Sequence, residues 1–143
     1  MINLDANVLI YAYNESAPQH TIARHWLEKQ FDEPDLLGFS WQVITAFLRL
    51  STNARAFPMP LPVAEACEVV DQWLDHPKTV LLLPTERHWP LLRALAVGGQ
   101  AIGPLLMDAH LAALSIEHGA ALATTDRDFS RFAGLRIIDP LAS

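Results

Sequence analysis

The chain has 143 residues, 51% of them apolar, and a formal net charge of −6, so we expect one hydrophobic core and a single domain over residues 1–143. The negative charge is the wrong sign for a protein that coats nucleic acid by bulk electrostatics, although a carboxylate metal site would itself contribute such charge. No apolar run approaches the roughly 18 residues that would span a bilayer, and no basic segment precedes an apolar stretch at the N-terminus, so we expect a soluble, cytoplasmic protein without a membrane segment.

The first half of the chain alternates short apolar runs with helical patterns. The opening run of β-branched and apolar residues ends at Leu4, and Asp5 separates it from a second apolar run through Tyr11, which predicts a helical turn. Ser40 is the expected N-cap of one later helix, and Pro62 suits the first turn of another. The helices predicted in this half cover residues 20–31, 41–52 and 63–74, and a short strand is predicted at residues 36–39.

The helical spacing of apolar residues also predicts which side chains face the core. Ile22 belongs to the apolar face of the helix at 20–31, and Trp41 to that of the helix at 41–52. All four tryptophans lie on apolar helix faces, where core or dimer packing explains them better than base stacking. Cys67 is the only cysteine, so no internal disulfide or thiolate cluster can form, and we expect a buried, inert thiol.

The second half of the chain continues the alternation of strands and helices. Pro90 lies either in the first turn of its helix or at that helix's true start, and the pattern leaves both open. Gly119 is expected to end the helix before it. Helices are predicted at 85–96 and 107–118, a short helical turn within 126–132, and strands at 79–83, 121–124 and 135–138. Short apolar strands separated by helices predict an α/β fold, a three-layer sandwich whose central parallel sheet is covered by helices on both faces.

Three aspartates far apart in the sequence should meet at one edge of this sheet. Asp5 directly follows the first strand, and Asp126 follows the strand at 121–124, with Asp128 two residues further on. Asp108 begins the helix that runs antiparallel into that strand, which places it above the strand's carboxyl end. Clustered carboxylates repel one another unless a cation neutralises them, and hard oxygen ligands favour Mg²⁺ or Mn²⁺.

A structural role would also account for some of these acids. An aspartate at a helix start is commonly a cap, which applies to Asp108, and Asp126 before Arg127 resembles an ordinary turn residue. Asp5 is harder to explain in this way, because it lies between two apolar runs where an unpaired carboxylate would be costly.

Three segments of the chain resemble the PIN-domain family, and specifically the VapC-type toxins of bacterial toxin–antitoxin pairs. They are the opening LDANVLIYA, the segment MDAHLAALSIEHGAALATTDRDFSRF, and the closing GLRIIDP. The second is the most specific, because it places an Asp-Ala helix, a glycine stop, a short strand and a Thr-(x)-Asp-Arg-Asp-Phe turn in the order typical of the family. The resemblance covers nearly the whole chain.

The resemblance implies a PIN-like fold and a Mg²⁺-dependent endoribonuclease that cleaves cellular RNA, such as tRNA or ribosomal RNA, and so inhibits translation. It also implies a homodimer that a cognate VapB-type antitoxin holds inactive. Asp5, Asp108 and Asp126 match the family's metal-binding aspartates, which are also its catalytic residues. Asp128 matches a further acidic position that is present more variably.

One position departs from the family pattern. The family usually has a glutamate just before the Phe-Leu-Arg of its second or third helix, and here that position is Ala46. The missing carboxylate favours one firmly bound metal ion over two, with Asp128 as a partial substitute. Loss of activity is the alternative that this departure leaves open.

Several other polar residues are candidates for contact with RNA. Arg49 lies close to the acidic site in the family, where it could orient a carboxylate, bind a phosphate or remain a solvated surface residue. Arg127 and Arg131 flank the acidic turn as candidate RNA contacts or simple surface charges. His110 follows Asp108 by two residues, so it points away on a helix, and we expect a structural or surface role.

Two other functions remain open at this point. A phosphatase with Asp5 as its nucleophile would usually need a carboxylate two residues on and a well-placed lysine, but the chain has Asn7 there and only two lysines, Lys29 and Lys78. A catalytically inactive PIN-fold interaction module would use the acidic surface and the tryptophans instead.

Overall fold

Five short parallel strands form the centre of the computed structural model, which describes residues 1–142, so residue 143 of the predicted domain lies outside the described part. They are β1 (Ile2–Leu4), β2 (Leu37–Phe39), β3 (Thr79–Leu81), β4 (Ala121–Ala123) and β5 (Ile137–Ile138). Their order across the sheet is β3-β2-β1-β4-β5, and every neighbouring pair is parallel. All five predicted strands are therefore present, although most are shorter than the apolar runs that predicted them.

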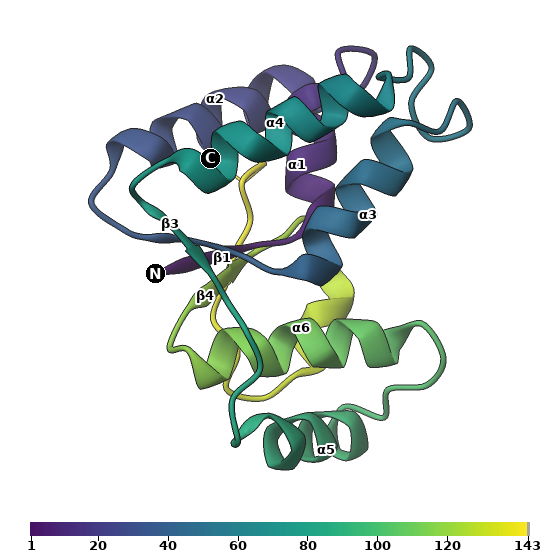
Figure 1. Ribbon diagram of the computed structural model, residues 1–143. Coiled ribbons are helices and arrows are strands. Elements are labelled where there is room, and N and C mark those ends of the chain that lie inside the picture. Colours follow the sequence, from purple (N-terminus) through teal and green to yellow (C-terminus); the bar gives the residue numbers. More distant parts are fainter. Residues whose placement is uncertain (143) are drawn as a thin grey trace.

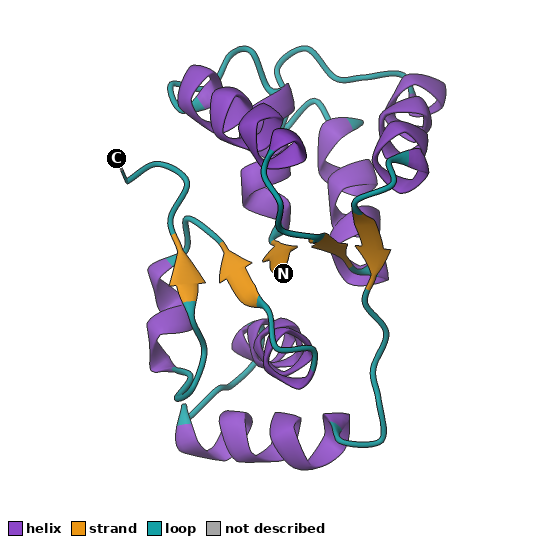
Figure 2. Ribbon diagram, turned by 90° about the vertical axis from the view of Figure 1, so that its left-hand side faces the viewer, coloured by secondary structure: helices purple, strands orange, loops and turns teal. Residues whose placement is uncertain are grey.

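Helices cover both faces of this sheet, which confirms the predicted three-layer α/β sandwich (Figures 1 and 2). The helices on one side are α1 (Ala6–Tyr13), α2 (His20–Asp32), α3 (Trp41–Ser51) and α4 (Val63–Asp75), and those on the other are α5 (His88–Gly98) and α6 (Leu105–Glu117). A short 3₁₀ helix, η1 (Arg127–Arg131), follows β4. No helix within residues 1–142 is long and apolar enough to cross a membrane.

The order of the strands creates a switch point between β1 and β4. From β1 the chain adds β2 and then β3 on one side, and it returns through α5 and α6 to add β4 on the other side. Leu4 pairs with Ala123 at the end of both strands, and Asp5 N–H donates to the Ala123 carbonyl at 3.0 Å. Ligands of open parallel sheets bind at the carboxyl ends of the strands where the order reverses, which is where Asp5 lies.

Local sequence signals account for several helix ends. Ser40 caps α3 as predicted, because its hydroxyl accepts a hydrogen bond from Val43 N–H at 3.3 Å. Gly119 has a φ of +66° just after α6, which is the left-handed conformation that favours glycine at a helix end. Pro90 lies in the first turn of α5, which begins at His88, and this settles the alternative that the sequence left open.

Three predicted core positions are instead on the surface. Ile22 is 54% exposed and Trp41 is 53% exposed, and Cys67 is also exposed, so the prediction of a buried thiol is wrong. Cys67 follows Ala66, which is fully buried, and a step of one residue turns a helical side chain about 100° away from the core face. Trp41 is the first residue of α3.

A partly buried chain of polar side chains joins α5 to α6. His88 Nδ1 bonds the Glu117 carboxylate, and His88 Nε2 lies 2.8 Å from His110 Nδ1. Glu117 also accepts a hydrogen bond from Thr85 N–H at 2.5 Å. His110 therefore contacts α5, which favours the structural role over the surface role that the sequence left open, and it links α5 to the helix that carries Asp108.

Candidate metal centre

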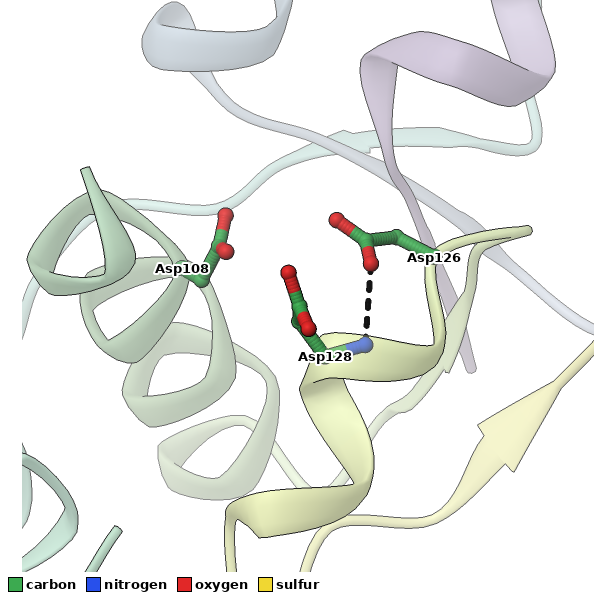
Figure 3. A group of neighbouring side chains, drawn as sticks. All are labelled: Asp108, Asp126 and Asp128. Atoms are coloured by element: carbon green, nitrogen blue, oxygen red, sulfur yellow. Dashed lines mark hydrogen bonds between the residues drawn. The ribbon is translucent and has the colours of Figure 1, made fainter. Parts of the chain in front are cut away.

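Three carboxylates gather at the carboxyl end of β4. Asp108 comes from α6, Asp126 directly precedes η1, and Asp128 lies in the first turn of η1 (Figure 3). One oxygen from each side chain lies within 4.8 Å of the other two, a spacing that suits ligands of a single ion. Asp108 and Asp126 are half-buried, and Asp128 is exposed.

The local backbone explains why Asp126 and Asp128 lie together. Asp126 is the N-cap of η1, and its Oδ1 accepts a hydrogen bond from Asp128 N–H at 2.9 Å (Figure 3). Asp108 lies in the first turn of α6, three residues after the helix begins at Leu105, so it is not the cap that one alternative supposed. The partial positive charge of a helix N-terminus favours a carboxylate at this position.

Asp5 lies beside these three carboxylates at the end of β1. Its Oδ1 accepts a hydrogen bond from Ala6 N–H at 2.7 Å, which makes Asp5 the N-cap of α1. Its Oδ2 accepts from the Thr124 hydroxyl at 2.8 Å and from Asn7 Nδ2 at 3.3 Å. Asp5 is thus firmly oriented, but it is not one of the three acids whose oxygens lie within 4.8 Å of one another.

The pKa values of two of these acids reflect crowding of negative charge. Burial, followed by the charges of Asp126, Asp5 and Asp128, raises the pKa of Asp108 to about 6 against an opposing effect of Arg131. Burial also raises the pKa of Asp5, although its hydrogen bonds from Thr124 and Ala6 lower it. A divalent cation would relieve this repulsion and hold both carboxyl groups in the ionised form.

Thr124 connects the two sides of the site, a role that the sequence did not reveal. Thr124 is buried directly after β4, where its Oγ1 donates to Asp5 Oδ2 and accepts from Asp126 N–H at 3.0 Å. Asn7 Nδ2 also donates to this hydroxyl at 3.3 Å. One hydroxyl therefore fixes an acid from β1 relative to an acid that follows β4. The available signal was a threonine two residues before Asp126.

The predicted arginines lie around the carboxylates rather than among them. Arg127 is exposed and lines a cavity of about 300 Å³ together with Thr125 and Asp126. Arg49 is exposed on α3 and lines a separate cavity with Ala46. Arg131 contacts Asp128 at 4.0 Å and donates to the Gly99 carbonyl at 3.1 Å, so it links η1 to the end of α5.

Comparisons with known proteins assign this fold and site to a family. The model of the PIN domain matches residues 2–135. Ribonuclease VapC37 of Mycobacterium tuberculosis is 41% identical to the chain over 139 residues, which cover 97% of the chain and 96% of that relative. The chain belongs to the VapC family of PIN-domain ribonucleases. Another VapC-family relative, Ribonuclease VapC31 of the same species, is 40% identical over 98% of the chain and 99% of its own length.

Solved structures of the VapC family share the fold at lower sequence identity. VapBC2 from Rickettsia felis, bound to a DNA fragment from its promoter, matches with a TM-score of 0.67 and 18% identity over 96% of this chain and 98% of that one. VapC20 of M. tuberculosis, described as a sarcin-ricin loop cleaving toxin, matches with a TM-score of 0.66 and 16% identity over 95% and 99% of the two chains.

The donor set of this VapC-family site fits a hard divalent metal ion. All three clustered side chains are carboxylates, whose oxygens suit Mg²⁺ or Mn²⁺ better than a softer metal. Lys78 cannot serve the phosphatase alternative, because it precedes β3 at the opposite, amino-terminal edge of the sheet and its amine bonds the Gln30 and Glu33 carbonyls. The arrangement can therefore hold a cation and present it to a phosphodiester.

Proposed function

We propose that this VapC-family ribonuclease is a Mg²⁺-dependent endonuclease toxin that hydrolyses phosphodiester bonds of tRNA or ribosomal RNA and so inhibits translation. Asp5, Asp108 and Asp126 form its catalytic metal site, and Asp128 supplies a further ligand. Mn²⁺ can replace Mg²⁺. The single PIN domain of residues 1–143 carries this site. The observation that carries the proposal is the cluster of three carboxylates within 4.8 Å at the switch point of the sheet.

The protein's own residues would organise the reaction around this cluster. A divalent ion at such a site lowers the pKa of a water molecule and neutralises charge on the phosphate. Asp108, Asp126 and Asp128 hold the ion, since their oxygens already converge. Asp5 completes the metal site from the end of β1, where Thr124 holds its carboxylate in place. Arg49 and Arg127 bind phosphates of the RNA, since a planar guanidinium can make paired hydrogen bonds to phosphate oxygens.

Partner proteins form the second part of the proposal. A VapB-type antitoxin neutralises the toxin, an inference supported by the fold shared with structures of VapBC complexes. The protein forms a symmetric homodimer, an inference supported by the exposed apolar side chains near the start of α3 and on α5 and α6. The exposed apolar side chains on α3, α5, α6 and the loop before α6 are Trp41, Trp89, Val97, Ile102, Leu106 and Met107.

Induction of the protein in a bacterial host, followed by mapping of new RNA 5′ ends, tests the activity directly. The wild-type protein should arrest growth and create 5′ ends at a few discrete positions in tRNA or ribosomal RNA. Asp126→Asn, expressed to the same level, should create none. If the wild-type protein accumulates in folded form without new 5′ ends, the inactive interaction module becomes the better account.

A further inference from the structure

The closing segment of the chain brings one more aspartate to the edge of the sheet that carries the carboxylates. Asp139 directly follows β5, and β5 pairs with β4, the strand that leads to Asp126. Thr124 N–H donates to the Ile138 carbonyl at 3.0 Å, so Asp139 lies opposite the end of β4. Asp139 is not one of the three acids whose oxygens converge, and the proposed metal site gives it no role.

Asp139 borders a cavity that adjoins the metal site. The cavity holds about 300 Å³, at the lower end of the roughly 300–1,000 Å³ of small-ligand sites. Asp126 lines the same cavity, so an occupant would lie next to the phosphate that the metal ion holds. Asp139 and Ile137 line it from β5 and its end, and both are exposed, so an occupant can reach them.

Two polar side chains in this wall have hydrogen-bonding capacity to spare. Asp139 Oδ1 accepts a hydrogen bond from Leu141 N–H at 3.0 Å, which orients the carboxylate, and its Oδ2 accepts none from residues 1–142. Asp139 forms no ion pair within these residues, although Arg127 lines the same cavity. The half-buried Thr125 bonds Asn7 through its backbone N–H, and its hydroxyl has no hydrogen bond in the described part of the chain.

These groups match the edge of a guanine base. A carboxylate only accepts hydrogen bonds, so it selects a base that presents donors side by side. Guanine presents two, N1–H and the 2-amino group, with the O6 acceptor beside them. The other three bases place a ring nitrogen lone pair or a carbonyl oxygen next to their donor, which a carboxylate repels. Ile137, whose side chain is 40% exposed, offers an apolar surface to the face of the base.

We propose that this cavity binds a guanine next to the bond that is cut, with Asp139 accepting from N1–H and the 2-amino group and Thr125 donating to O6. This inference rests on the proposed ribonuclease function and adds to it a specificity-determining residue outside the carboxylate cluster. Arg127 binds phosphate for any sequence, because phosphates carry no sequence information. The choice of nucleotide therefore falls to Asp139.

Two RNAs that differ by one amino group test the role of Asp139. Mapping of wild-type cuts in purified bacterial RNA should first show guanine on one fixed side of each cut. A short single-stranded RNA that spans such a cut is then made with guanine or with inosine, which lacks only the 2-amino group. In Mn²⁺, wild type should cleave the guanine RNA with a kcat/KM about tenfold above that of the inosine RNA. Asp139→Ala should cleave the two RNAs equally.

Two further variants serve as controls for Asp139→Ala. Asp139→Asn keeps an acceptor for Leu141 N–H and so preserves the turn, but its amide donor opposes the guanine donors, so it should also lose the preference for guanine. Asp71→Ala removes an exposed charge from α4 and should keep the wild-type ratio. The calorimetric affinity for Mn²⁺ should stay within about twofold in all three variants, because Asp139 and Asp71 lie outside the cluster and exposed charges are screened.

The outcomes separate this inference from the proposed function. If the wild-type protein cuts no RNA, the proposed function fails and the guanine subsite with it. If the protein cuts RNA without guanine beside the cuts, or cleaves the guanine and inosine RNAs equally, the subsite is wrong and the ribonuclease function stands. A folded Asp139→Asn protein that keeps the wild-type ratio would also overturn the subsite. A loss of Mn²⁺ affinity in that variant would do the same, because Asp139 would then act on the metal.

Discussion

Replacing Asp108 by asparagine should stabilise the metal-free protein and also remove its response to metal. Burial and the charges of Asp126, Asp5 and Asp128 raise the pKa of Asp108 to about 6. Above that pH the wild-type protein folds around a carboxylate whose charge is unfavourable, and Asp108→Asn removes the charge. The same substitution removes an oxygen ligand from the cluster, so metal binding should weaken.

The size of the effect follows from the pKa. The rise from 3.8 to about 6 corresponds to about 3 kcal/mol between the two protonation states. Asp108 is partly exposed, and solvent screening reduces the expected gain to about 1.5 kcal/mol. Loss of a favourable charge in the first turn of α6 subtracts about 0.5 kcal/mol. A net gain of about 1 kcal/mol should raise Tm by roughly 3 °C for a chain of this length.

The dependence on pH has a definite sign. The wild-type protein binds a proton more tightly when folded than when unfolded, so its stability falls as pH rises from 3.8 to about 6. The advantage of Asp108→Asn should therefore be full above pH 6 and should disappear toward pH 3.8.

Thermal melts in EDTA and in Mn²⁺ measure both effects, with Asp71→Asn on the exposed surface of α4 as a control of equal charge change. In EDTA at neutral pH, Asp108→Asn should melt above wild type. In Mn²⁺ at a hundredfold excess over its Kd, wild type should gain about 2.7 kcal/mol and the order should reverse. The reasoning is refuted if Asp108→Asn melts below wild type in EDTA, or if Mn²⁺ stabilises both proteins equally.

Three further predictions concern the surroundings of the site. Thr124→Val, which removes the hydroxyl between Asp5 and Asp126, should weaken Mn²⁺ binding about tenfold, as measured by calorimetry. An unchanged affinity would show that the Thr124 hydroxyl does not position the two aspartates. Ala46→Glu should lower the metal concentration that RNA cleavage needs, because the cavity at position 46 has room for a further oxygen ligand. A folded variant whose metal requirement is unchanged or higher would show that position 46 does not serve the metal. Light scattering should show a dimer at micromolar concentration that survives Asp5→Asn, whereas a monomer would contradict the role given to the exposed apolar side chains.

The convergence of the acids could be predicted from sequence because it depends only on topology. Short apolar strands alternating with helices predict a parallel sheet, and residues that follow strands of such a sheet meet at one edge. Asp5 and Asp126 each follow a strand, and the structure places them on neighbouring strands, β1 and β4. The position of Asp108 followed from the antiparallel course of α6 relative to β4.

The contacts around the acids could not be predicted, because they depend on register and on which element packs beside which. The bond from Thr124 to Asp5 requires Leu4 to lie opposite Ala123, and no local pattern fixes that pairing. The bond between Glu117 and His88 likewise depends on how α5 packs against α6. Helical periodicity misplaced Trp41 for a related reason, since it shows which residues share a face but not where the covered part of that face ends.

Cleavage of purified bacterial RNA by the purified protein tests the central claim most directly. The account predicts cuts at discrete sites in Mg²⁺ and none in EDTA. It also predicts that Asp126→Asn abolishes cleavage under the same conditions while Asp71→Asn cleaves as wild type does. Cleavage that persists in EDTA, or in a folded Asp126→Asn protein, would contradict a catalytic site built on these carboxylates.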